Sequence, residues 1–371
     1  PPPPPPFFPT PPPPPPPRVA SRGLGDVYKR QALLGELDGQ DMAGYTRSFV
    51  DDLRTAMGAD VDVDQDADWS GVLCLGMGGS GSGGLFLKAL SDDSGGLPFV
   101  VWRDYGVPSW WGPDWLVFAT SYSGNTEETL DGVRDVLASG GTVVGICSGG
   151  ELEELLADSE DSICLNVPPG QMPRSAFGHI FGTQLAACWA LGLLPAPGED
   201  DRSDMLERLS TASSDADIAD GEGMSATLAR SLVDREMGIV APTCLSPAAY
   251  RFACQLNENS AKFARSADVP EMNHNEVVAW TGDAASNQAL LMMSCDGLHP
   301  RAQARIDWML AEIEATPTWR VECEGESLLE RLLYAAHVTD WVSIGLAVLT
   351  GEDPSEMPAI ISLKAHLATI Q

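Results

Sequence analysis

Three hydroxyl side chains lie close together after one short apolar run of this 371-residue chain. The run 116–120 leads into Ser121-Tyr122-Ser123-Gly124-Asn125-Thr126, and a segment with helical periodicity begins directly afterwards. Ser121, Ser123 and Thr126 would then lie beside the free backbone N–H groups of a helix start, where they can surround a phosphate monoester without lysine or arginine. This spacing predicts a phosphate-binding loop, the alternative being an elaborate helix cap.

A glycine-rich turn precedes this loop in the chain. Gly76-Met77-Gly78-Gly79-Ser80-Gly81 follows an apolar run and fits the G-x-G-x-x-G pattern of dinucleotide-binding turns. Asp104 follows the next apolar run at about the spacing of the acidic residue in that pattern. The turn therefore allows an NAD-dependent oxidoreductase, a sugar-phosphate contact, or a tight turn without a ligand.

Short apolar runs alternate with helical segments, which predicts an α/β fold with parallel sheets covered on both faces. The expected strands of the first half are 72–75, 99–102, 116–120, 143–147 and 163–167, and a long apolar helix covers 175–194. In the second half we expect strands at 239–241, 289–294 and 319–321, with helices at 248–264, 301–314, 328–349 and 356–370. The chain thus divides into two αβα units of similar size, each a mainly parallel sheet flanked by helices.

The expected boundaries follow from composition. Residues 32–69 form N-terminal helices, 70–195 the first unit, 196–220 an acidic linker with a short helix at 205–209, and 221–371 the second unit. Residues 1–31 open with nearly continuous proline, which forms polyproline II and no packed core. Because Asp26-Val27-Tyr28-Lys29-Arg30-Gln31 resembles a translated transposase adapter, we expect residues 1–31 to be artefactual, the alternative being a disordered arm.

The composition excludes several classes of function. The net charge is −31, and lysine stands only at positions 29, 88, 262 and 364, which indicates a salt-adapted protein or simply an acidic cytoplasmic one. Such a surface repels nucleic acid. Eight scattered cysteines contain no C-x-x-C pair and indicate buried thiols in a reducing compartment, with neither disulfides nor a zinc site. We found no apolar run suited to a membrane-spanning helix.

The hydroxyl loop resembles the phosphate-binding loop of the sugar isomerase (SIS) domain family, in which a turn matching Gly79-Ser80 also contacts the sugar phosphate. This resemblance assigns the glycine turn to a sugar phosphate in place of a dinucleotide. Further motifs follow in order: Pro173-Arg174-Ser175-Ala176-Phe177, Asn257-Glu258-Asn259-Ser260-Ala261-Lys262, Asn273-His274-Asn275 and Pro358-Ala359-Ile360-Ile361-Ser362-Leu363-Lys364. From about residue 70 to the C-terminus, the chain is similar to the bifunctional phosphoglucose/phosphomannose isomerases of archaea and some bacteria, which implies two tandem SIS units.

The resemblance implies an aldose–ketose isomerase that interconverts fructose 6-phosphate with glucose 6-phosphate, mannose 6-phosphate or both. The reaction moves a proton between C1 and C2 through a cis-enediolate and needs no metal or cofactor. By resemblance, Glu258 is the base and Arg174 stabilises the enediolate. His274 protonates the ring oxygen from the second subunit of a homodimer, and Lys364 assists at the ring-opening hydroxyl.

The chain departs from the family pattern at one position. Bifunctional members carry a threonine seven residues before the helix lysine, where this chain has Met357. The lost hydroxyl bears on the choice between the two C2 epimers, and an alignment shift of one residue would place Glu356 there. Two alternatives stay open: a non-catalytic sugar-phosphate-binding SIS protein, and the NAD-dependent oxidoreductase suggested by the glycine turn and Asp104.

Overall fold

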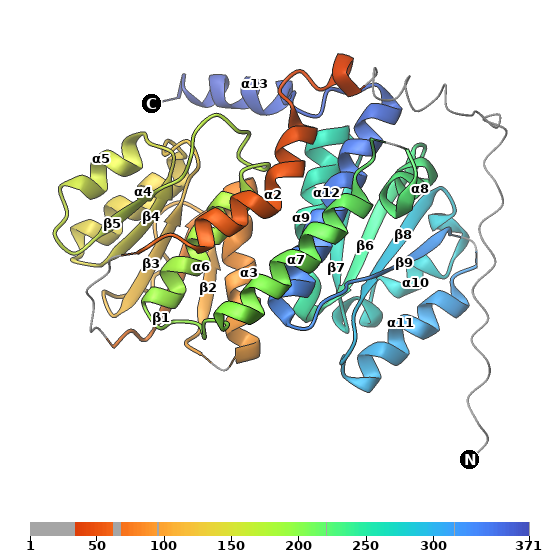
Figure 1. Ribbon diagram of the computed structural model, residues 1–371, viewed down its shortest axis with the longest axis horizontal. Coiled ribbons are helices and arrows are strands. Elements are labelled where there is room, and N and C mark those ends of the chain that lie inside the picture. Colours follow the sequence, from red (N-terminus) through yellow and green to blue (C-terminus); the bar gives the residue numbers. More distant parts are fainter. Residues whose placement is uncertain (1–33, 62–67, 95, 220, 315, 371) are drawn as a thin grey trace.

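The computed structural model describes residues 34–61, 68–94, 96–219, 221–314 and 316–370. The expectation for residues 1–31 falls outside this part of the chain. Two parallel sheets lie side by side, with a layer of helices between them (Figure 1). The lead-in helix α2 (Met42–Met57) packs in this layer.

The first sheet has the strand order β2-β1-β3-β4-β5, and all of its pairings are parallel. Its elements are β1 (Gly71–Gly76), α3 (Gly78–Ser94), β2 (Phe99–Trp102), β3 (Trp115–Thr120), α4 (Glu127–Ala138), β4 (Val143–Cys147), α5 (Glu151–Ala157), β5 (Ile163–Asn166) and α6 (Phe177–Ala190). The five expected strands are confirmed to within one residue at each end.

The second sheet has the order β7-β6-β8-β9, again parallel throughout. The elements are α7 (Glu199–Ala216), α8 (Gly223–Leu232), β6 (Glu236–Pro242), η1 (Thr243–Leu245), α9 (Ser246–Ser260), β7 (Ala264–Val269), η2 (Glu271–His274), α10 (Val277–Trp280), η3 (Asp283–Ala285), β8 (Gln288–Ser294), α11 (Pro300–Glu312), β9 (Thr318–Glu322), α12 (Leu328–Thr350) and α13 (Pro358–Leu367).

Alternating strand residues fill separate cores on the two faces of each sheet. In β1, Val72 packs into the central core while Leu73 faces α4 and α5. In β6, Ile239 belongs to the same central core while Val240 faces α10 and α11. The central core is thus shared by both units, because helix α3 of the first packs against α9 and α12 of the second. This arrangement holds the two units against one another.

Helices α7 and α9 and strand β7 differ from the sequence-based prediction. The segment expected as a linker with a short helix contains the 18-residue helix α7, which packs against α2, α8 and α12. Helix α9 ends at Ser260 with a left-handed Ala261, four residues before the predicted end of this helix, and strand β7, which begins at Ala264, was not predicted. Strand β7 escaped prediction because it is an edge strand with polar residues at Arg265, Ser266 and Asp268, so it lacks an apolar run.

Helix α12 corrects the expectation that no apolar segment could span a bilayer. Its 23 residues are long and apolar enough to do so by length and composition. However, 83% of its most apolar window is buried inside the protein, against α8 and α9. Among the described residues no other helix passes this test, and α12 is the core helix of the second unit.

Candidate active site

The hydroxyl loop lies where β3 ends and α4 begins. The hydroxyls of Ser121 and Thr126 are 2.8 Å apart, and Ser121 Oγ also accepts the backbone N–H of Thr126 at 3.3 Å. Ser80 Oγ accepts the N–H of Tyr122 at 3.1 Å, which ties the glycine turn to the loop. Ser121 is fully buried, whereas Ser123 is exposed. The predicted phosphate ligands Ser80, Ser121, Ser123 and Thr126 therefore lie together at the carboxyl edge of the first sheet.

Gly124 has a conformation and a packing that require glycine. Its φ is +67°, and a Cβ there would lie 1.8 Å from the carbonyl oxygen of Gly149 in the loop after β4. Leu152 N donates to the Gly124 carbonyl at 2.9 Å, and Ser148 Oγ donates to the Tyr122 carbonyl at 2.6 Å. The hydroxyl loop is therefore held by the neighbouring β4–α5 loop.

The absence of a side chain at Gly79 allows the backbone of Arg174 to lie close to the glycine turn. A Cβ on Gly79 would lie 2.9 Å from Cα of Arg174 and 3.0 Å from its backbone nitrogen. The turn thus needs glycine for the close approach of Arg174, whether or not a dinucleotide binds. Asp104, the acidic residue of the dinucleotide alternative, is exposed at the end of β2 and accepts the N–H of Tyr105 at 2.8 Å.

Arg174 and Glu258 meet at the boundary between the two units. Arg174 precedes α6 of the first unit, and Glu258 lies in the last turn of α9 in the second. Arg174 Nη1 is 3.5 Å from Glu258 Oε2 and 3.0 Å from Met357 Sδ. Arg174 Nη2 donates to the carbonyl of Pro354. The structure therefore brings together three of the predicted site residues, Arg174, Glu258 and Met357, beside Gly79.

Burial shifts the pKa values of both Glu258 and Arg174. Desolvation raises the pKa of Glu258 above its ordinary value, while the positive charges of Arg174 and Arg251 oppose the shift. Desolvation also lowers the pKa of Arg174, and Glu258 opposes that shift. A carboxylate with a raised pKa beside a buried guanidinium can accept a proton from carbon while the arginine stabilises an oxyanion.

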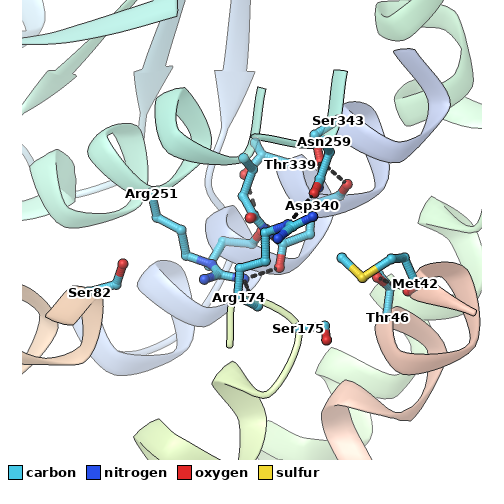
Figure 2. Close-up of polar contacts among 12 residues, drawn as sticks. Met42, Thr46, Ser82, Arg174, Ser175, Arg251, Asn259, Thr339, Asp340 and Ser343 are labelled. Carbon is cyan, nitrogen blue, oxygen red and sulfur yellow. Dashed lines mark hydrogen bonds and ion pairs between the residues drawn. The ribbon is translucent and has the colours of Figure 1, made fainter. Parts of the chain in front are cut away.

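A buried polar network beneath Arg174 was not predicted from the sequence. Arg174 Nε donates to Asn259 Oδ1 at 2.6 Å, and Arg251 Nη2 donates both to the Arg174 carbonyl at 3.0 Å and to Asp340 Oδ2 at 2.5 Å (Figure 2). Gln255 donates to the other oxygen of Asp340 at 2.8 Å. The spacing of residues 251, 255 and 259 could have indicated this network. It places three polar residues on one face of α9, and all three are buried.

The structure does not bring His274 and Lys364 to this pair. His274 is exposed at the end of η2 in the second unit, and Lys364 is exposed on α13. Among the described residues, neither has a hydrogen bond or ion pair with Arg174 or Glu258. No described residue of α13 is buried, and its apolar side chains Ile361 and Leu363 are 66% and 56% exposed. The roles predicted for His274 and Lys364 stay predictions.

The part of the chain that the structure describes has no group of three His, Cys, Asp or Glu side chains placed to hold a metal ion. All eight cysteines are free thiols, and five of them are buried. The side chains gathered at the site supply hydroxyls, a carboxylate and a guanidinium.

Comparisons with known protein families match both units. The SIS domain model matches residues 67–194, and the model of the bacterial phospho-glucose isomerase C-terminal SIS domain matches residues 222–367. The C-terminal domain of glucosamine-fructose-6-phosphate aminotransferase from Francisella tularensis shares the fold, with a TM-score of 0.65, 14% identity, and coverage of 86% of this chain and 99% of that one. The predicted fold of two tandem SIS units is confirmed.

Two curated relatives carry the comparison further. The bifunctional phosphoglucose/phosphomannose isomerase of Aquifex aeolicus is 32% identical over 308 residues, covering 81% of this chain and 91% of the relative. The D-glucosamine-6-phosphate 4-epimerase of Sulfolobus acidocaldarius is 31% identical over 229 residues, covering 60% of this chain and 68% of the relative. Both relatives have names that specify a phosphorylated hexose or hexosamine.

Proposed function

Because this chain belongs to the bifunctional phosphoglucose/phosphomannose isomerase family, we propose that it interconverts fructose 6-phosphate with glucose 6-phosphate, mannose 6-phosphate or both. The observation that carries the proposal is the contact of Arg174 with both Glu258 and the Gly79 turn. This contact joins a candidate proton acceptor to the hydroxyl loop that we assign to the phosphate.

Each unit has a separate task in this proposal. The hydroxyls of Ser80, Ser121, Ser123 and Thr126 hold the phosphate, together with backbone N–H groups at the start of α4. Glu258 removes a proton from one of C1 and C2 and returns it to the other, through a cis-enediolate. Arg174 stabilises the negative charge that develops on the enediolate oxygens. None of these steps requires a metal.

Ring opening needs two further groups, His274 and Lys364, and we propose that they reach the site when two chains assemble. We assign proton transfer at the ring oxygen to His274, which crosses into the partner's site in a homodimer. The support is its exposure at the end of η2, where no hydrogen bond or ion pair among the described residues joins it to Glu258 of its own chain. Lys364 assists at the ring-opening hydroxyl. Its helix α13 starts directly after Met357, which already contacts Arg174, and the exposed apolar residues of α13 favour burial on assembly.

The net charge of −31 supports function in a salt-rich cytoplasm, where the repulsion between acidic groups is screened. The pairing of a buried arginine with the carboxylate of Glu258 favours proton transfer over a non-catalytic sensor or an NAD-dependent oxidoreductase. Both alternatives remain outcomes of the test.

The test is conversion of fructose 6-phosphate by the purified protein at low and high salt, with and without a chelator. Coupled assays for glucose 6-phosphate and mannose 6-phosphate identify the product. We expect turnover that survives chelation, and loss of turnover on chelation would contradict the metal-free mechanism. Tight binding of hexose phosphates without any turnover would favour the sensor, and fluorescence quenching by added NADH would favour the oxidoreductase.

A further inference from the structure

The guanidinium of Arg174 is held on three sides. Its side chain is only 2% exposed, Nε donates to Asn259 Oδ1 at 2.6 Å, and Nη2 donates to the carbonyl of Pro354. These two bonds fix the plane of the group, which leaves Nη1 directed toward Glu258 and Met357. A planar guanidinium with two fixed edges has little freedom to rotate.

Asn259 is itself held in one orientation. Its Nδ2 donates to Ser343 Oγ at 2.9 Å, and Ser343 Oγ donates to the carbonyl of Asp340 at 2.7 Å, both on α12. Figure 2 shows this chain of contacts running from α12 through Asn259 to Arg174. Since Nδ2 has this acceptor, Oδ1 is the atom that faces the arginine. Asn259 is 1% exposed, so bulk water does not compete with it as a partner of Arg174.

We propose that Asn259 is a positioning residue for the isomerisation: it holds the guanidinium of Arg174 so that Nη1 faces the carboxylate of Glu258. Asn259 directly follows Glu258 in α9, so one rigid helix carries the base and sets the orientation of the arginine. The inference rests on the proposed function, because it takes Arg174 to stabilise the enediolate.

The test is Asn259→Ala, which removes the acceptor and frees the guanidinium. We expect kcat for fructose 6-phosphate to fall about a hundredfold, because small misplacements of a catalytic group have costs of that order. KM should change little, since the phosphate is held elsewhere and the lost interaction belongs to the transition state. The kcat is expressed per folded enzyme, because a loss of folded protein would also lower the apparent kcat without changing KM.

A second readout is the acid limb of the pH–rate profile. Arg174 and Arg251 are the positive groups that favour ionised Glu258, while Cys254 lies one turn and Tyr250 two turns earlier on the same face of α9. When Arg174 moves away, one of the two opposing charges is lost and the pKa of Glu258 rises further. The acid limb of Asn259→Ala should therefore move to higher pH.

The matched control is Asn257→Ala, two residues earlier in α9. Asn257 bonds the backbone of Ala253 and Ala264 through three hydrogen bonds and does not contact Arg174. Its loss should lower the melting temperature while leaving kcat and the acid limb unchanged. If Asn259→Ala shows the same pattern as this control, Asn259 is merely structural and the inference is overturned.

An NMR measurement keeps the inference separate from the proposed function. The ¹⁵N-labelled Nε–H of Arg174 should give a slowly exchanging signal in the wild type and in Asn257→Ala, and a fast-exchanging one in Asn259→Ala. If the wild type turns over no hexose phosphate, the proposed function fails while this signal still decides whether Asn259 holds the arginine. If Asn259→Ala does not fold, Ser343→Ala replaces it, and unchanged Nε–H protection in that variant would overturn the inference.

Discussion

The two units share a strand order but differ in the loops at the carboxyl edges of their sheets. Strands β2-β1-β3-β4 of the first correspond in order to β7-β6-β8-β9 of the second. After β3 the chain forms the hydroxyl loop, whereas after β8 it reads Cys295-Asp296-Gly297-Leu298-His299. Helix α11 then begins with Pro300, which has no N–H. The N-cap residue is His299, whose Nδ1 accepts a hydrogen bond from the backbone N–H of Arg301 at 3.1 Å.

The two units therefore share a fold but differ in the loop that we assign to phosphate binding. The second unit repeats the sheet but lacks the features that favour a phosphate at this edge: it has an acidic residue, no hydroxyl and a proline where the first has serines and free N–H groups. Its contribution to the proposed site comes instead from the far end of a helix, where Glu258 reaches Arg174. In the proposed function, phosphate binding and proton transfer are divided between two copies of one fold.

The sharpest test of this division replaces one left-handed glycine in each loop. Gly124→Ala would place a Cβ 1.8 Å from the Gly149 carbonyl and distort the hydroxyl loop, so we expect kcat/KM to fall at least about a hundredfold. Gly297→Ala has a similar φ of +79°, and among the described residues nothing lies within 4 Å of its Cβ. It should cost only about 1 kcal/mol of stability. Equal losses of activity in the two variants would contradict the division.

A smaller effect concerns the choice of sugar. Met357 Sδ contacts Arg174 at the proposed pocket, where a threonine would restore the hydroxyl of the bifunctional pattern. Met357→Thr should change the ratio of kcat/KM values for mannose 6-phosphate and glucose 6-phosphate by about tenfold, as expected for one pocket contact. Met357→Leu is the matched control, since it keeps the apolar volume. An unchanged ratio in both variants would place epimer selection outside this position.

The smallest expected effect is on stability and its dependence on pH. The folded-state pKa of Glu258 is raised by burial, so its ionised form disfavours folding, and this cost appears as pH rises through the raised value. Glu258→Gln removes it. We expect the melting temperature of the variant to exceed that of the wild type slightly at neutral pH, with the difference disappearing below the ordinary pKa of glutamate. A difference independent of pH would argue against the burial of an ionised carboxylate.

Much of the fold could be predicted from apolar runs, because parallel strands that are buried on both faces have continuous hydrophobic sequences. The hydroxyl loop was recognisable since its residues are contiguous. Strand β7 and the burial of Arg174 could not be predicted from the sequence. The pairing of an edge strand and the contact of Arg174 with Asn259 both depend on residues far apart in the chain. The position of α13 follows from no local pattern: its apolar residues predict burial, yet they are exposed in the single chain.

The proposed function takes Glu258 as the proton carrier, and isotope exchange tests this role. Fructose 6-phosphate is incubated in D₂O with the wild type and with Glu258→Gln, and deuterium at C2 of the aldose product is followed by NMR. Binding of 6-phosphogluconate serves as the control that the phosphate site is intact. The account predicts deuterium incorporation by the wild type and, in the variant, a loss of several powers of ten with binding retained. Wild-type exchange in Glu258→Gln would contradict it.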